Sequence, residues 1–201
     1  MNTSELFVLN GAIYCKDILS KEMSHYLTHV LLRSNAINGN KGDAQIPNAL
    51  AVIDHDMFLE TIHEKIWPLL ENIIAKPLLP TYAYARLYSN GDVLEKHRDR
   101  PACEISITVQ LGKSHHYAWP IYIGNHRFDM AEGDGVIYYG CDVEHWRDKC
   151  DGPNGYYSGQ AFFHFVTADG ANVTHANDAS VRPDYAANAY VKHRAYQMET
   201  K

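Results

Sequence analysis

Residues 84–99 read Tyr84-Ala85-Arg86-Leu87-Tyr88-Ser89-Asn90-Gly91-Asp92-Val93-Leu94-Glu95-Lys96-His97-Arg98-Asp99. From Thr81 to Tyr88, polar and aromatic side chains alternate with Ala and Leu, and this period of two predicts a strand with one polar-aromatic face. Asn90-Gly91-Asp92 is a strong turn signal. His97 and Asp99 then point the same way if residues 93–99 continue as a strand or enter a tight loop, because side chains two apart share a face.

A second histidine of interest lies far along the chain from this pair. His145 follows His97 by 48 residues (145 − 97), in a separate short strand candidate. Two imidazoles and one carboxylate suit a divalent first-row metal and leave three coordination positions open, as in non-haem Fe(II) oxygenases. A His-x-Asp triplet by itself is weak evidence. If His97, Asp99 and His145 do not converge, the chain is instead a sandwich-type binding module without catalysis.

Helical patterns precede the quoted stretch and short strand patterns follow it. Residues 20–33 carry apolar side chains at helical spacing with Ser20 placed as the N-cap, and residues 54–75 carry a second such pattern. Asn and Gly recur in residues 35–48, which predicts a surface loop that could act as a lid. The later strand candidates are residues 104–111, 119–123, 136–139, 144–147 and 161–166.

The chain has the size and composition of one globular domain. Its 201 residues are 46% hydrophobic and 21% charged, and we expect a helical support (1–80), a β core (81–167) and a C-terminal tail without a clear period (168–201). The net charge of −6 argues against a nucleic-acid partner. No stretch is apolar enough to span a membrane, and the cysteines show no CxxC spacing, so we expect a reduced, cytoplasmic location. The cysteines are Cys15, Cys103, Cys141 and Cys150.

The stretch 84–99 resembles the strand and turn that precede the iron in prolyl-hydroxylase-like Fe(II)/2-oxoglutarate-dependent dioxygenases. In that family an Arg-x-Tyr, a turn with Gly and a His-x-Asp follow one another in this order. Residues 133–138, Gly-Asp-Gly-Val-Ile-Tyr, resemble the family's Gly-Asp turn before a strand, and Glu144-His145-Trp146-Arg147 supplies the distal histidine. The order and spacing match over roughly residues 80–167.

This resemblance implies a mainly β, α+β fold in which N-terminal helices support a double-stranded β-helix, the jelly roll that cupins also have. It implies that the catalytic residues His97, Asp99 and His145 bind Fe(II), with 2-oxoglutarate as cosubstrate and O2 as oxidant, and that succinate and CO2 are released. Asp99 implies hydroxylation, because related halogenases carry a small residue at this position. The substrate would be a small molecule or a peptide, with no nucleic-acid or membrane partner.

One departure from the family concerns the cation that anchors the distal carboxylate of 2-oxoglutarate. The family places an Arg or Lys shortly after the distal histidine, where this chain reads Gly-Tyr-Tyr-Ser-Gly-Gln at residues 155–160. Arg147 shares the face of His145 on a strand and can form a bidentate pair with a carboxylate, and Lys113 is the second candidate. Tyr88 matches a family tyrosine at the 2-oxoglutarate pocket. The missing cation keeps an alternative open, a cupin-type isomerase or lyase that does not use 2-oxoglutarate.

Overall fold

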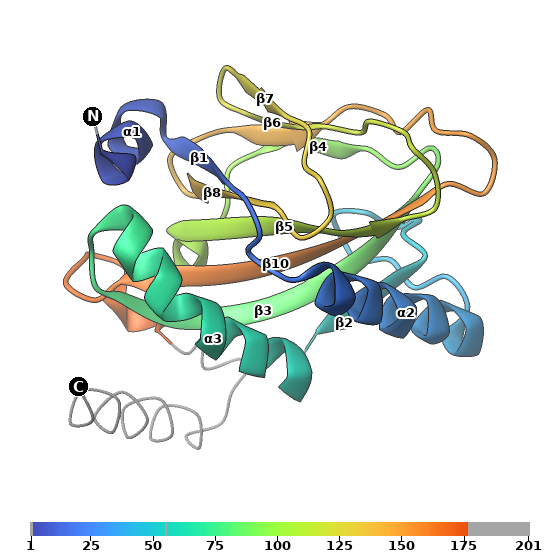
Figure 1. Ribbon diagram of the computed structural model, residues 1–201, viewed down its shortest axis with the longest axis horizontal. Helices are drawn as coiled ribbons and strands as arrows, with labels where there is room; N and C mark the ends of the chain where they lie inside the picture. Colours follow the sequence, from blue (N-terminus) through green and yellow to red (C-terminus); the bar gives the residue numbers. More distant parts are fainter. Residues whose placement is uncertain (1, 55, 177–201) are drawn as a thin grey trace.

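Two antiparallel sheets face each other in the computed structural model, which describes residues 2–54 and 56–176 (Figure 1). The larger sheet has the strand order β1-β8-β5-β10-β3-β2, and the smaller has the order β4-β9-β6-β7. The strands are β1 (Ala12–Cys15), β2 (Ala51–Asp54), β3 (Leu78–Ser89), β4 (Leu94–His97), β5 (Ile105–Lys113), β6 (Ile121–Ile123), β7 (His126–Phe128), β8 (Gly135–Tyr139), β9 (His145–Arg147) and β10 (Tyr157–Thr167). This arrangement is the expected double-stranded β-helix.

The two predicted helices are present with shifted ends. Ser20 caps α2 (Lys21–Asn38) by accepting the backbone N–H of Met23, as expected, but the helix continues past residue 33, so the predicted loop begins at residue 39. Residues 51–54 form β2, so the second predicted helix, α3 (Met57–Ile74), begins three residues later than predicted. Asp56 is its N-cap. The other helices are α1 (Thr3–Asn10) and the 3-10 turns η1 (Pro101–Cys103) and η2 (Val173–His175).

The segment 1–80 therefore supplies strands of the larger sheet as well as the helices that support the core. Its two strands, β1 and β2, form the two edges of the larger sheet, where β1 pairs with β8 and β2 pairs with β3. Of the predicted tail, only residues 168–176 lie within the described part, and the expectation for residues 177–201 falls outside it.

The main hydrophobic core lies between the larger sheet and the helices that cover its outer face (Figure 1). Alternation along the central strands directs their apolar side chains to this side, where they pack against α2 and α3. Members of this cluster include Leu31, Leu70, Ala85, Ile107 and Phe163, all essentially inaccessible to solvent. Helix packing against one face leaves the other face of the sheet for the interior between the two sheets.

That interior holds polar and aromatic side chains beside two smaller apolar clusters that join the sheets. Ser106, Thr108 and Gln110 alternate with the apolar side chains of β5, and the structure buries all three. They meet the polar positions of β10, since Gln160 donates to Gln110 at 2.7 Å and Thr108 donates to Gln160 at 3.3 Å. Buried polar groups that satisfy one another in this way fix the relative position of adjacent strands.

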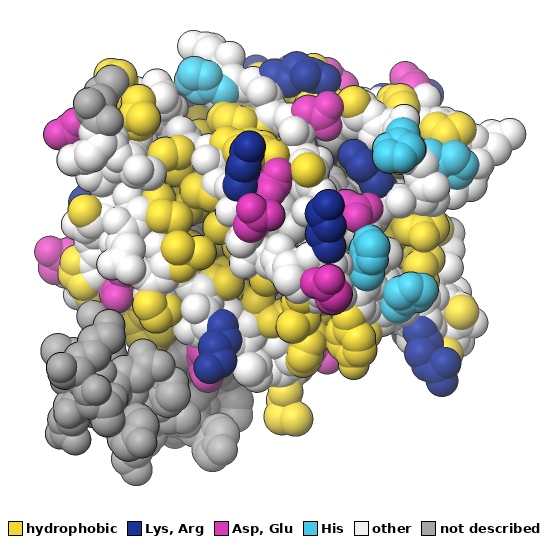
Figure 2. Space-filling view, viewed as in Figure 1, with side chains coloured by type: hydrophobic (Ala, Val, Ile, Leu, Met, Phe, Trp, Pro, Cys, Tyr) yellow, Lys and Arg dark blue, Asp and Glu magenta, His cyan; other side chains and the backbone are white. Residues whose placement is uncertain are grey.

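The outer surface is mixed in charge. Figure 2 shows acidic and basic side chains interspersed on the face that carries α2 and α3. Among the described residues, none of the helices combines the length and the apolar character that crossing a bilayer requires.

One side chain ties α2 to the larger sheet. The Thr28 hydroxyl donates to the Ser24 carbonyl at 2.8 Å and accepts the backbone N–H of Gly112, on β5, at 2.7 Å. Thr28→Val keeps the shape but leaves that buried N–H without a partner, so we expect a loss of about 1–3 kcal/mol in the free energy of unfolding, measured by urea denaturation. Thr61→Val is the matched control, since the exposed Thr61 bonds only within its own helix. Equal effects of the two substitutions would refute a tie between helix and sheet.

Candidate metal centre and its cavity

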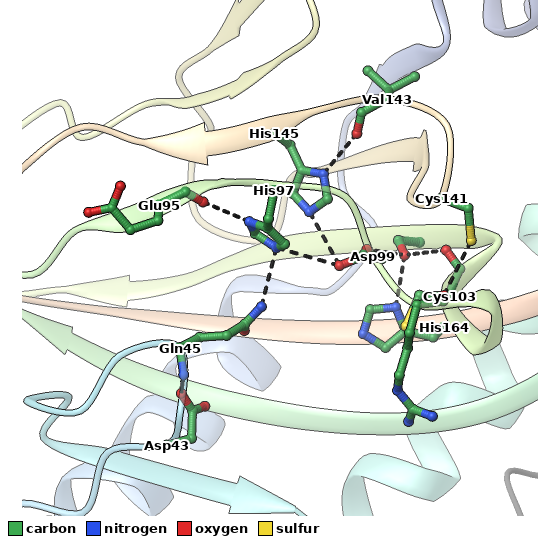
Figure 3. Close-up of polar contacts among 12 residues, drawn as sticks. Asp43, Gln45, Glu95, His97, Asp99, Cys103, Cys141, Val143, His145 and His164 are labelled. Carbon is green, nitrogen blue, oxygen red and sulfur yellow. Dashed lines mark hydrogen bonds and ion pairs between the residues drawn. The ribbon is translucent and has the colours of Figure 1, made fainter.

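His97, Asp99 and His145 converge at one end of the space between the sheets (Figure 3). Antiparallel pairing of β4 with β9 sets His97 directly opposite His145. Asp99 Oδ1 lies 3.6 Å from His97 Nε2 and 3.4 Å from His145 Nε2. Two ligands bound at about 2.1 Å and at right angles on a divalent ion are about 3 Å apart, so small side-chain adjustments bring the three atoms onto one ion.

Backbone carbonyls orient both imidazole rings for this role. His97 Nδ1 lies 2.7 Å from the Glu95 carbonyl oxygen, and His145 Nδ1 lies 3.0 Å from the Val143 carbonyl oxygen. A carbonyl oxygen only accepts, so each Nδ1 carries a proton, and Nε2 is the nitrogen that faces Asp99 and that would bind a metal through its lone pair when unprotonated. Metal-binding histidines are commonly held by such a bond at their second nitrogen.

The Asp99 carboxylate is fixed by backbone as well as by side chains. The N–H of Asp99 donates to the Gly140 carbonyl at 2.8 Å, and Ser106 donates to Asp99 Oδ2 at 3.2 Å. A Cβ at position 140 would overlap Asp99 Oδ2 and the Cys103 carbonyl, so this approach requires glycine. Burial raises the pKa of Asp99, but hydrogen bonds from His145 and His97 outweigh it and hold that pKa below its usual value. The carboxylate is therefore charged and suited to a cation.

A second set of donors shares this carboxylate. Asp99, Cys103 and His164 also bring ligand atoms within 4.8 Å of one another. Burial raises the pKa of the Cys103 thiol and lowers the pKa of His164 to about 4. The thiol therefore stays protonated at neutral pH, and only a thiolate is a good metal ligand. The two-histidine set is the better metal site.

The candidate site opens into a cavity of about 410 Å³, a size typical of small-molecule pockets. His97 and Asp99 lie in its wall together with Tyr82, Tyr84 and His164, which face inward from β3 and β10. His164 is also buried. Its Nδ1 is 2.8 Å from the Ser106 hydroxyl, and its Nε2 has no hydrogen-bond partner among the described residues.

The predicted loop reaches into the same cavity. Asp43 forms an ion pair with Arg86. Figure 3 shows Gln45 beside His97, and its side-chain amide lies 3.2 Å from His97 Nε2. Arg86 is on β3, lines the cavity and is 2% exposed. The sequence predicted that Arg86 shares a strand face with Tyr84 and Tyr88 and assigned it no role. Asp43 and Gln45 were not singled out, because an irregular loop carries no periodicity from which the direction of its side chains follows.

Arg147 lies two residues from His145 on β9, with its guanidinium buried. The side chain is fully enclosed at 1% exposure and is not part of the cavity wall. Its Nη1 donates to the Trp119 carbonyl at 2.6 Å, and its Cζ lies 4.9 Å from the centre of the Trp119 ring. Its Nε and Nη2 have no hydrogen-bond partner among the described residues. Burial lowers the pKa of this guanidinium.

The other two candidates for cosubstrate binding lie in different places. Tyr88 is fully buried, packs edge-on against Trp119 and accepts a hydrogen bond from Arg86 Nη1 at 2.7 Å. Its own hydroxyl hydrogen is therefore free to point elsewhere. Lys113, at the end of β5, lines a separate cavity of about 500 Å³ with Lys21, His115 and His116. That cavity contains none of the three candidate metal ligands.

Comparison with known proteins finds relatives by structure rather than by sequence. No protein-family profile and no curated protein sequence matches the chain. Among solved structures, a prolyl-4-hydroxylase from Pseudomonas putida matches with a TM-score of 0.61 at 13% identity, covering 81% of this chain and 96% of that one. HygX from Streptomyces hygroscopicus, with nickel and 2-oxoglutarate bound, matches with a TM-score of 0.59 at 9% identity, covering 82% and 86%.

A third similar structure has a different stated activity. SnoN, described as a non-haem α-ketoglutarate-dependent epimerase from nogalamycin biosynthesis, matches with a TM-score of 0.61 at 11% identity, covering 81% of this chain and 79% of that one. At these identities the likeness concerns the fold. The chain has the double-stranded β-helix fold found in prolyl hydroxylases and in other 2-oxoglutarate-dependent Fe(II) oxygenases.

Proposed function

We propose that this protein is an Fe(II)- and 2-oxoglutarate-dependent dioxygenase that hydroxylates a C–H bond of a small molecule or a protein side chain, releasing succinate and CO2. The observation that carries the proposal is the convergence of His97, Asp99 and His145 on a fold whose similar structures include 2-oxoglutarate-dependent enzymes. When bound, the iron and its cosubstrate would supply the oxidising chemistry. The chain's own residues would hold, orient and shield them.

The ligand set supports iron over a purely structural metal. Two neutral nitrogens and one carboxylate leave coordination positions for a chelating cosubstrate and for O2, whereas structural zinc sites are closed by four protein ligands. The carboxylate of Asp99 also argues for oxygen transfer to the substrate, in line with its presence in hydroxylases. Since an epimerase shares this fold, the outcome of the oxidation is part of the proposal.

Arg147 is the proposed anchor for the distal carboxylate of 2-oxoglutarate. Two unpaired N–H groups on a buried guanidinium form a donor pair suited to a carboxylate, and leaving them unpaired is costly. Residues two apart on a strand are about 6.6 Å apart, a separation that a five-carbon dicarboxylate can bridge from His145 to Arg147. Lys113 is the weaker candidate because Arg147 is on the same strand as His145, whereas the cavity lined by Lys113 contains none of the three candidate metal ligands.

Tyr88 is proposed to contact the same cosubstrate. Its hydroxyl already accepts from Arg86, so the remaining hydrogen can be donated to a carboxylate oxygen. Tyr88 and Arg147 both contact Trp119, which places the two candidate groups around one aromatic ring.

Metal and cosubstrate binding can be tested together. Under anaerobic conditions, Fe(II) plus 2-oxoglutarate should give a weak metal-to-ligand absorption band in the visible region, and aerobic incubation should release succinate. His97→Ala should abolish both, because one of three protein ligands is lost. His126→Ala, at an exposed histidine of β7 in the same sheet, should leave both unchanged. Tight metal binding without any response to 2-oxoglutarate would favour the cupin-type isomerase or lyase.

The anchor assignment has its own test. Arg147→Lys keeps a positive charge but removes the paired donors, so the dissociation constant of 2-oxoglutarate should rise at least about thirtyfold, equivalent to about 2 kcal/mol. Calorimetry with Co(II)-loaded protein gives this constant, and unchanged Co(II) affinity shows that the fold is intact. Lys113→Met is the matched control and should have no effect. The reverse pattern would transfer the anchor role to Lys113.

A further inference from the structure

A buried arginine other than Arg147 faces the candidate metal ligands. Arg86 lines the same cavity as His97 and Asp99, and its guanidinium lies between two rings of its own strand, 5.4 Å from the centre of Tyr84 and 5.2 Å from that of Tyr88. Its Nη1 donates to the Tyr88 hydroxyl at 2.7 Å. These contacts hold the cation in one orientation.

Arg86 forms an ion pair with Asp43, which belongs to the loop at residues 39–50. Both Nε, at 3.0 Å, and Nη2 donate to the same oxygen of Asp43, Oδ2. Asp43 Oδ1 instead accepts the backbone N–H groups of Gln45 and Ile46, each at 2.9 Å. A guanidinium pairs best with a carboxylate when two parallel donors meet two oxygens. Asp43 therefore fills the position without the best geometry for it.

Asp43 can be exchanged for another anion at modest cost. Its side chain is 29% exposed, whereas that of Arg86 is 2% exposed. A carboxylate that returns to water regains its hydration, so the cost of withdrawing Asp43 falls on the arginine. Arg86 is buried and cannot return to water in this way, and a buried charge without a counter-charge is strongly unfavourable. Arg86 therefore requires an anion in this cavity, and Asp43 is an exchangeable one.

The charges around the cavity favour an incoming anion. Among the described residues, its wall contains three arginines and three aspartates, namely Arg86, Arg98, Arg100, Asp43, Asp54 and Asp99. With a cation bound to Asp99 and with Asp43 withdrawn, the three arginines face one remaining carboxylate, that of Asp54. Arg98 and Arg100 are exposed, where positive charge raises the local concentration of anions.

From this geometry we infer that Arg86 binds a carboxylate group of the primary substrate, and that the side chain of Asp43 occupies the same position when the loop lies against the cavity. The inference rests on the proposed function, because it names the class of molecule that the oxygenase would accept beside its metal. In this assignment the two arginines bind different carboxylates: Arg147 binds that of the cosubstrate, and Arg86 binds that of the substrate.

Paired probes of equal shape test the inference through binding rather than turnover. Butyrate with butyramide, and benzoate with benzamide, are titrated by calorimetry into protein saturated with Co(II) and 2-oxoglutarate, so that the cosubstrate position is filled. Asp43→Asn keeps the acceptor for the loop backbone but removes the charge that pairs with Arg86. We expect this variant to bind at least one carboxylate about tenfold more tightly than wild type, with no gain for its amide.

Two further variants show where the effect arises. Arg86→Lys in the Asp43→Asn background should remove the preference for carboxylate over amide. Asp151→Asn removes one charge from the exposed surface and should produce no preference. The inference is overturned if no carboxylate gains over its amide in Asp43→Asn, if Asp151→Asn gives the same gain, or if Arg86→Lys weakens 2-oxoglutarate binding as much as Arg147→Lys does. Failure of wild-type protein to bind 2-oxoglutarate counts against the proposed function alone, because the probe comparison can be repeated without it.

Discussion

Antiparallel pairing between β4 and β9 is the contact on which the candidate site depends. Each strand is short, yet their register sets His97 opposite His145 and Leu94 opposite Arg147. The same pairing therefore positions two metal-ligand candidates and places the buried guanidinium further along the strand. The third candidate ligand, Asp99, is held by the backbone of Gly140, just beyond β8. Displacing either contact would separate donors that must lie within a few ångströms of one another.

The interior between the sheets shows that this chain uses buried polar groups where most cores are apolar. Arg86 and Arg147 are among its largest fully buried side chains, and desolvating a guanidinium is unfavourable unless it is paired. The main hydrophobic core lies on the other side of the larger sheet, against α2 and α3. The largest apolar cluster and the candidate metal ligands thus lie on opposite sides of the larger sheet, and two smaller apolar clusters join the two sheets across the interior.

Long periodic elements could be predicted from the sequence, whereas short edge elements could not. The period of two through β3 and β5 and the helical period of α2 are confirmed, because each is sustained over many residues. The four-residue strands β1 and β2 and the three-residue β7 were not predicted. Such strands form because an adjacent strand offers unpaired backbone groups. Three or four residues are too few to show a periodicity from which they could be predicted.

The sequence by itself determined the kind of side chains available, the face they share and the order in which they occur, since alternation and turn chemistry are local properties. It identified His97, Asp99 and His145 as a candidate set, and the structure brings them together. Tertiary structure alone decided that Asp43 pairs with Arg86 across 43 residues and that Arg147 lies buried with donors unpaired. Those features depend on which strands and loops meet in space, and pairing between distant segments is set by the packing of the whole chain.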